Sequence, residues 1–100
     1  MSKRVYLDSA ATTCLLPEVI DEMVQVLQND YGNPSSTHSF GRSSKTLVES
    51  SRKSIAKHLN CSSSELIFTS SGTEATNWIL NNAIKHNGIK RIISSKLEHH

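Results

Sequence analysis

Apolar residues recur at helical spacing in three separate stretches of the chain. The first covers about residues 17–28 and starts with a proline, which suits the first turn of a helix. The second covers about residues 41–59, and the third covers about residues 73–86. Asn87 and Gly88 follow the third stretch, and glycine readily adopts the left-handed conformation that ends many helices. The pattern therefore predicts three amphipathic helices.

Two short apolar runs, at residues 65–69 and 89–94, flank the third predicted helix and have the composition of strands. A strand, a helix and a strand within about thirty residues are typical of a βαβ unit with a parallel pair. Another short β-type run, at residues 5–7, leads into small residues at 8–13. We therefore expect an α/β fold, with Trp78 of the third helix in its core.

Composition and charge exclude several classes of protein. Of 100 residues, 36% are hydrophobic and 20% are charged, which is ordinary for a soluble domain. The net charge is only +2 and the basic residues are scattered, so we expect no nucleic-acid partner. No apolar run is long enough to cross a bilayer, and no secretory leader is visible. Cys14 and Cys61 fit no metal spacing, so we expect free thiols, a cytoplasmic location and no metal.

The sequence SSGTEATN joins the run at 65–69 to the third predicted helix. Ser71 and Glu74 have the spacing of a capping box, which by itself would only start a helix. The turn also follows a predicted strand, at the edge where open α/β sheets bind ligands. Gly72 lets a ligand approach the backbone, and the amides of Gly72 and Thr73 favour an anion. The context therefore favours a phosphate-binding turn, although neither the Walker pattern nor G-x-G-x-x-G is present.

Four segments, in chain order, resemble motifs of the cysteine desulfurases, which are pyridoxal-phosphate (PLP) enzymes of fold-type I in the class-V aminotransferase family. They are VYLDSAATT, YGNPSSTHSFG, SSGTEATN and SSKLEHH. Together they span nearly the whole chain, and they are closest to the nitrogen-fixation and iron–sulfur-cluster assembly branch. The resemblance implies the N-terminal part of a large PLP-binding domain, a three-layer α/β/α structure with a mostly parallel sheet.

The same resemblance implies how the chain divides. Residues 1–14 would pack with the small domain, residues 15–100 would start the large domain, and the remainder of both domains lies outside this sequence. The lysine that carries the cofactor, the acidic partner of its ring nitrogen and the persulfide-forming cysteine have no counterpart here. The 100-residue chain alone is therefore expected to be inactive.

The resemblance also implies residue roles. Gly72 and Thr73 match residues that bind the PLP phosphate, and His99 matches the histidine that stacks on the pyridine ring and moves protons in catalysis. His99 could instead be a surface residue or part of a tag, but it follows a predicted strand as in the family. The positions that match the neighbourhood of the substrate pocket are Ala11, Thr12 and Asn33. His38, His58 and His86 are expected to be surface or structural residues.

As a member of this family, the full-length protein would remove sulfur from L-cysteine with PLP and give L-alanine and an enzyme-bound persulfide. The expected partners are sulfur-acceptor or scaffold proteins and a second copy in a homodimer. Two alternatives stay open. One is a selenocysteine lyase or another PLP enzyme of the class-V aminotransferase type. The other is a non-catalytic fragment that interacts with another chain.

Overall fold

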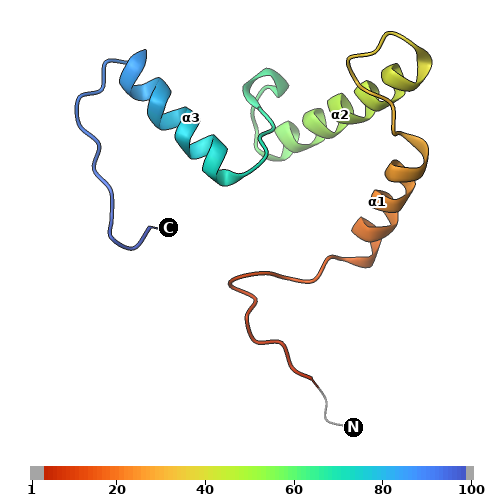
Figure 1. The fold of residues 1–100 in the computed structure, drawn as a ribbon, viewed down its shortest axis with the longest axis horizontal. Helices are drawn as coiled ribbons and strands as arrows, with labels where there is room; N and C mark the ends of the chain where they lie inside the picture. The colour runs from red at the N-terminus through yellow and green to blue at the C-terminus, as the bar shows by residue number, and fades with distance from the viewer. Residues whose placement is uncertain (1–3, 99–100) are drawn as a thin grey trace. The chain divides into compact units, whose positions relative to one another are not determined.

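The computed structural model describes residues 4–98, and helices make up the regular structure of that range (Figure 1). The α-helices are α1 (Pro17–Asn29), α2 (Ser39–His58) and α3 (Gly72–Lys85), and a short 3-10 helix, η1, covers Ser63–Glu65. The three predicted helices are confirmed, and each boundary lies within two residues of its predicted place. The chain divides into two compact units, residues 1–63 and 64–100.

The predicted strands are wrong for this structure. Residues 4–98 contain no β-strand, and the runs at 5–7, 65–69 and 89–94 lack strand structure. Residue 65 belongs instead to η1. Apolar and β-branched composition favours a strand, but a strand forms only when its backbone pairs with a neighbouring strand. The predicted parallel βαβ pair is therefore absent from the described residues, which do not themselves show the α/β class.

α1 starts at a proline and has no side-chain cap at its N-terminus. Pro17 needs none for its own nitrogen, which carries no hydrogen, and Glu18 in the first turn is favourable beside the helix dipole. The amide of Asp30 closes the other end by donating to the carbonyl of Val26 at 2.9 Å. The apolar stripe of the helix is exposed to solvent. It consists of Val19, Ile20, Met23, Val24 and Leu27.

The segment between α1 and α2 packs tightly on the start of α2. A Cβ on Gly41 would lie 2.6 Å from the carbonyl oxygen of Asn33, and one on Gly32 would lie 2.5 Å from the carbonyl of Phe40. Such contacts are too short for any side chain, so both positions need glycine. The rings of Tyr31 and Phe40 stack with their centroids 5.8 Å apart. The loop at residues 30–38 is therefore held against the first turn of α2.

Few side chains are buried in the described residues. Ala56 is the apolar side chain that the fold buries, at 2% exposure, and Ser44 is the buried polar one. Trp78 is 52% exposed, which contradicts its predicted place in a core. The sheet that was expected to cover this side chain is missing from residues 4–98, which leaves Trp78 half exposed. No helix within residues 4–98 is long and apolar enough to cross a membrane.

Candidate functional site

The turn at residues 69–75 has the geometry of a capping box with one change. The hydroxyl oxygen of Ser71, the N-cap of α3, accepts a hydrogen bond from the amide of Glu74 at 3.2 Å, as predicted. The carboxylate of Glu74 reaches one residue further back than the predicted cap. Its Oε2 accepts from the amide of Ser70 at 2.7 Å and also from the hydroxyl of Ser70.

Two more hydrogen bonds hold the carbonyl of Ser71. The hydroxyl of Thr69 donates to it at 3.0 Å, and the amide of Ala75 donates to it at 3.2 Å. Ser71 is thus fixed through its side chain and its backbone oxygen, while Ser70 is fixed by Glu74. These bonds within residues 69–75 therefore hold the conformation of the turn.

The first two residues of α3 keep unused hydrogen-bond donors. Within the described range, no acceptor contacts the amides of Gly72 and Thr73 or the hydroxyl of Thr73. The first amides of a helix have no partner inside the helix, and the positive end of the helix dipole lies beside them. This set of donors suits a phosphate dianion.

Gly72 is not required by the packing of the chain. Apart from its two neighbours and the backbone of its own helix, no atom of residues 4–98 lies within 4 Å of the place where its Cβ would be, and its φ is not positive. Space at this position is therefore free for a group that comes from outside residues 4–98. The donor set and the open glycine together fit the phosphate of PLP.

A negative charge lies beside these donors. Hydrogen bonds from the hydroxyl and then the amide of Ser70 hold the pKa of Glu74 below its usual value. The carboxylate is therefore ionised at neutral pH, and it opposes a phosphate by charge while it fixes the turn by hydrogen bonds.

The predicted substrate-pocket residues Ala11 and Thr12 lie in a turn closed on the carbonyl of Asp8. The amides of Ala11 and Thr12 approach that oxygen at 3.0 and 3.3 Å. Tyr6 donates its hydroxyl hydrogen to the same carbonyl at 3.0 Å, and its oxygen lies 2.5 Å from the hydroxyl of Thr12. Because a phenol has one hydrogen, Thr12 donates to Tyr6.

Asn33 shapes its own loop in this structure. Its side-chain oxygen accepts from the amide of Ser35 at 2.9 Å, and its carbonyl accepts from the amide of Ser36 at 2.9 Å. This is the Asx-turn arrangement, in which the side chain mimics a backbone turn. His38 caps α2 through Nδ1, which accepts from the amide of Gly41 at 3.3 Å, so its predicted structural role is confirmed.

The predicted site residues fall into two groups. Ala11, Thr12 and Asn33 belong to the unit of residues 1–63, and Gly72 and Thr73 belong to the unit of residues 64–100. His99 lies outside the described residues. The sequence interpretation missed Ser70 and Tyr6, whose hydrogen bonds shape the two turns. A serine four residues before a glutamate at a helix start was a usable signal for Ser70, whereas Tyr6 gave none.

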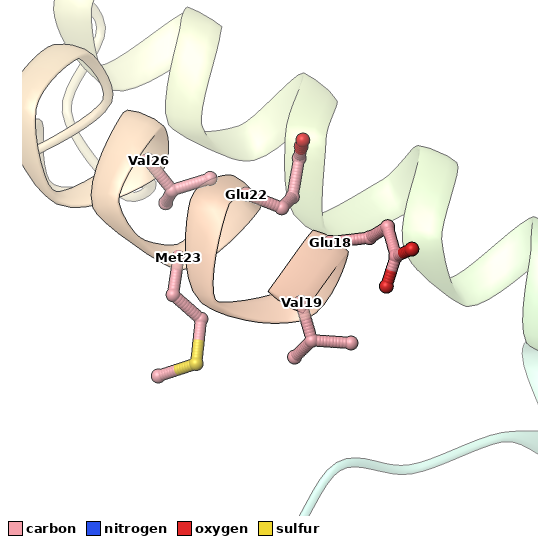
Figure 2. Close-up of a pocket in the computed structure, with 5 residues that line it drawn as sticks. All are labelled: Glu18, Val19, Glu22, Met23 and Val26. Carbon is pink, nitrogen blue, oxygen red and sulfur yellow. The ribbon is translucent and has the colours of Figure 1, made fainter. Parts of the chain in front are cut away.

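Surface hollows in the described residues lie along α1 and beside α3. All five residues that line a hollow of about 460 Å³ come from α1, and Figure 2 shows Val19 and Met23 leaving the helix on the same side, one turn apart. A second hollow, of about 400 Å³, lies beside α3 and includes Thr69, Trp78 and Ile79. Neither hollow includes Gly72 or Thr73.

Comparison with known proteins identifies the family. The family model described as aminotransferase class-V matches residues 5–100. The chain belongs to the class-V aminotransferase family.

Several relatives in this family carry names that describe their activity. Cysteine desulfurase IscS of Dictyoglomus turgidum is 48% identical over 103 residues, which cover 100% of this chain and 26% of that protein. Putative cysteine desulfurase IscS 1 of Bacillus subtilis is 43% identical, covering 98% of this chain and 26% of that protein. Human selenocysteine lyase is 42% identical over 84 residues, covering 84% of this chain and 19% of that protein. The chain thus spans about a quarter of the length of its desulfurase relatives.

Proposed function

We propose that this chain forms the N-terminal part of a PLP-dependent cysteine desulfurase. The whole enzyme takes sulfur from L-cysteine, releases L-alanine and keeps the sulfur as a persulfide on a protein cysteine. In the balanced reaction, the C–S bond of the substrate and the S–H bond of the enzyme cysteine break. An S–S bond forms on the enzyme, and a C–H bond forms on the carbon that becomes the methyl group of alanine. The main support is the pair of free amides at Gly72 and Thr73, in a chain whose desulfurase relatives match over its full length.

In this proposal the described residues bind and orient the cofactor. The amides of Gly72 and Thr73 and the hydroxyl of Thr73 hold the phosphate at the N-terminus of α3. When bound, PLP withdraws electrons from the substrate carbon, and the protein supplies position and charge. His99 is proposed to stack on the ring and move protons, and Ala11, Thr12 and Asn33 to border the substrate.

The proposed fold, location and partners of the full-length protein follow from the family of this chain. The fold is the fold-type I α/β/α large domain, with residues 1–14 packing against a small domain. The enzyme is a cytoplasmic homodimer that delivers sulfur to acceptor or scaffold proteins for iron–sulfur clusters or other sulfur-transfer pathways. The names of the IscS relatives support the desulfurase activity within this proposal.

The test of the function is alanine release from L-cysteine by the full-length protein loaded with PLP. Formation of alanine together with a protein persulfide is expected. An enzyme that binds PLP and releases no alanine would contradict the proposal.

A variant at Thr73 tests the phosphate turn separately. Thr73→Ala should weaken PLP binding roughly tenfold or more, since a hydrogen bond to a charged group contributes about 1.5–3 kcal/mol. Thr73→Ser keeps the hydroxyl and should bind PLP nearly as well as the native protein. Affinity is measured by titrating the apoprotein with PLP, and thermal unfolding checks that both variants fold. Equal affinity in all three proteins would mean that the turn only starts a helix.

Selenocysteine lyase is the second candidate, because relatives with that name are about as similar to this chain as some desulfurases. The two activities are separated by comparing kcat/KM for L-cysteine and L-selenocysteine in the same preparation. Strong preference for selenocysteine would favour the lyase. Transfer of the amino group to a keto acid would favour an aminotransferase instead.

A further inference from the structure

Glu74 stands out in the turn because its charge has the wrong sign for a residue beside a phosphate. Its ionised carboxylate belongs to the third residue of α3, directly after the two residues that carry the free donors. A carboxylate near a bound dianion weakens binding by repulsion. We therefore expect Glu74 to make interactions that favour phosphate binding and offset this repulsion.

The hydrogen bonds of Glu74 supply such interactions. The carboxylate takes both donors of Ser70, its amide and its hydroxyl, and so ties the residue before the N-cap to the first turn of α3. The arc Ser71-Gly72-Thr73 lies between these two anchored residues. Its free amides are thereby held in one arrangement before any ligand arrives.

The same bonds decide which donors remain for a ligand. Ser70 carries an amide and a hydroxyl in the same turn, and both could serve an anion if they were free. Glu74 occupies both of them, and the hydroxyl of Ser71 accepts from the amide of Glu74. With both donors of Ser70 occupied, the donors that remain at the start of α3 are those of Ser71, Gly72 and Thr73, so an anion is directed to this arc rather than to Ser70.

We propose that Glu74 is a positioning residue for the cofactor phosphate, which it orders through Ser70 without touching the phosphate. This inference rests on the proposed PLP function. It differs from a simple capping role, because a cap stabilises the helix whether or not a phosphate is bound.

The test measures how much the phosphate group contributes to cofactor affinity. The full-length apoprotein is titrated with PLP and with pyridoxal, which lacks the phosphate, and the affinity ratio is compared between proteins. Glu74→Gln keeps the size of the side chain and removes its charge. Positioning predicts that this variant loses about tenfold in the PLP-to-pyridoxal ratio, because the bonds to Ser70 weaken. Charge repulsion alone predicts the reverse, a rise in the ratio.

Ser70→Ala is the second variant, since it removes the hydroxyl that Glu74 holds and leaves Ser71 as the cap. It should lower the same ratio in the same direction by a smaller factor. Ser50→Ala, in the middle of α2, is the matched control and should leave the ratio unchanged. Thermal unfolding of each protein reports any general loss of stability.

The outcomes distinguish a failure of the proposed phosphate turn from a failure of the positioning role of Glu74. If the native protein binds PLP and pyridoxal equally, the proposed phosphate turn itself fails. If the native protein prefers PLP and Glu74→Gln keeps or raises that preference, the positioning role of Glu74 is wrong. Equal losses for PLP and pyridoxal would show a purely structural cap and would also overturn the inference.

Discussion

At the scale of single residues, Gly41 and Gly72 have opposite surroundings. Gly41 is enclosed, because a Cβ there would meet the carbonyl oxygens of Asn33 and Ser36. Gly72 is open, because no atom of the described residues, other than its own neighbours and helix backbone, lies within 4 Å of its missing Cβ. The packing therefore requires glycine at Gly41, whereas at Gly72 we propose that the open space serves a ligand.

This difference predicts opposite effects of the same substitution. Gly41→Ala should destabilise the full-length protein by about 1–3 kcal/mol, because the loop or α2 must shift. Gly72→Ala should leave stability unchanged or raise it by about 0.4–1 kcal/mol, since alanine restricts the unfolded chain. It should nevertheless weaken PLP binding, because its methyl group occupies the approach to the amides.

Denaturant unfolding and PLP titration of the two variants measure these effects. Gly41→Ala is the control for general damage to the fold. Full PLP affinity in Gly72→Ala would show that no phosphate comes close to this position, and a large loss of stability would show an unseen packing role.

At the scale of secondary-structure elements, the sequence predicted the features that depend on residues close together in the chain, such as the positions of the helices. Apolar spacing and Pro17 placed α1, and the Ser71 and Glu74 pair placed the start of α3. The start of α2 was placed two residues late, because its cap is His38, a residue outside the usual N-cap types. Helix starts are thus predictable when a common cap marks them.

The strands failed because pairing is not a local property. Residues 65–69 and 89–94 have suitable composition, but a strand also needs a partner backbone, which no local pattern reveals. The hydrogen bonds of the candidate site were likewise predictable only where they depend on spacing along the chain. The capping bond of Ser71 was predictable from spacing, whereas the preference of Glu74 for Ser70 depends on side-chain geometry.

The cap at α2 gives a prediction at this scale. His38→Ala should cost about 1 kcal/mol of stability, because the amide of Gly41 loses its acceptor. His38→Asn, with an oxygen in place of Nδ1, should retain most of that stability. The measurement is the urea midpoint of the full-length protein at neutral pH, with His86→Ala, at the exposed end of α3, as the control. No loss in His38→Ala would mean that the other contacts of the loop hold it without this cap.

At the scale of the whole molecule, the described residues leave most large apolar side chains in water. Leu7, Ile93 and Leu97 are 90%, 89% and 95% exposed, and the apolar stripe of α1 is uncovered. Burial of such side chains contributes roughly 1.5–3 kcal/mol each, and stable domains depend on it. The chain gains little of this free energy by itself.

We therefore expect residues 1–100, produced alone, to show no cooperative thermal unfolding by calorimetry. The full-length protein is the control and should unfold with a sharp heat-absorption peak. A sharp transition in the isolated 100-residue chain, without cofactor, would contradict this expectation and favour the alternative of a non-catalytic fragment that acts through another chain.

The exposed stripe of α1 has a consequence during protein synthesis. In a protein as long as the IscS relatives, the 100 residues of this sequence make up about a quarter of the chain, so more than nine tenths is still to be made when α1 has been translated. At about 5–20 residues per second, that interval lasts on the order of tens of seconds. Val19, Met23 and Leu27 then emerge from the ribosome well before most of the partner sequence exists. We therefore expect the apolar stripe of α1 to be an early target for chaperones that bind short apolar segments of nascent chains.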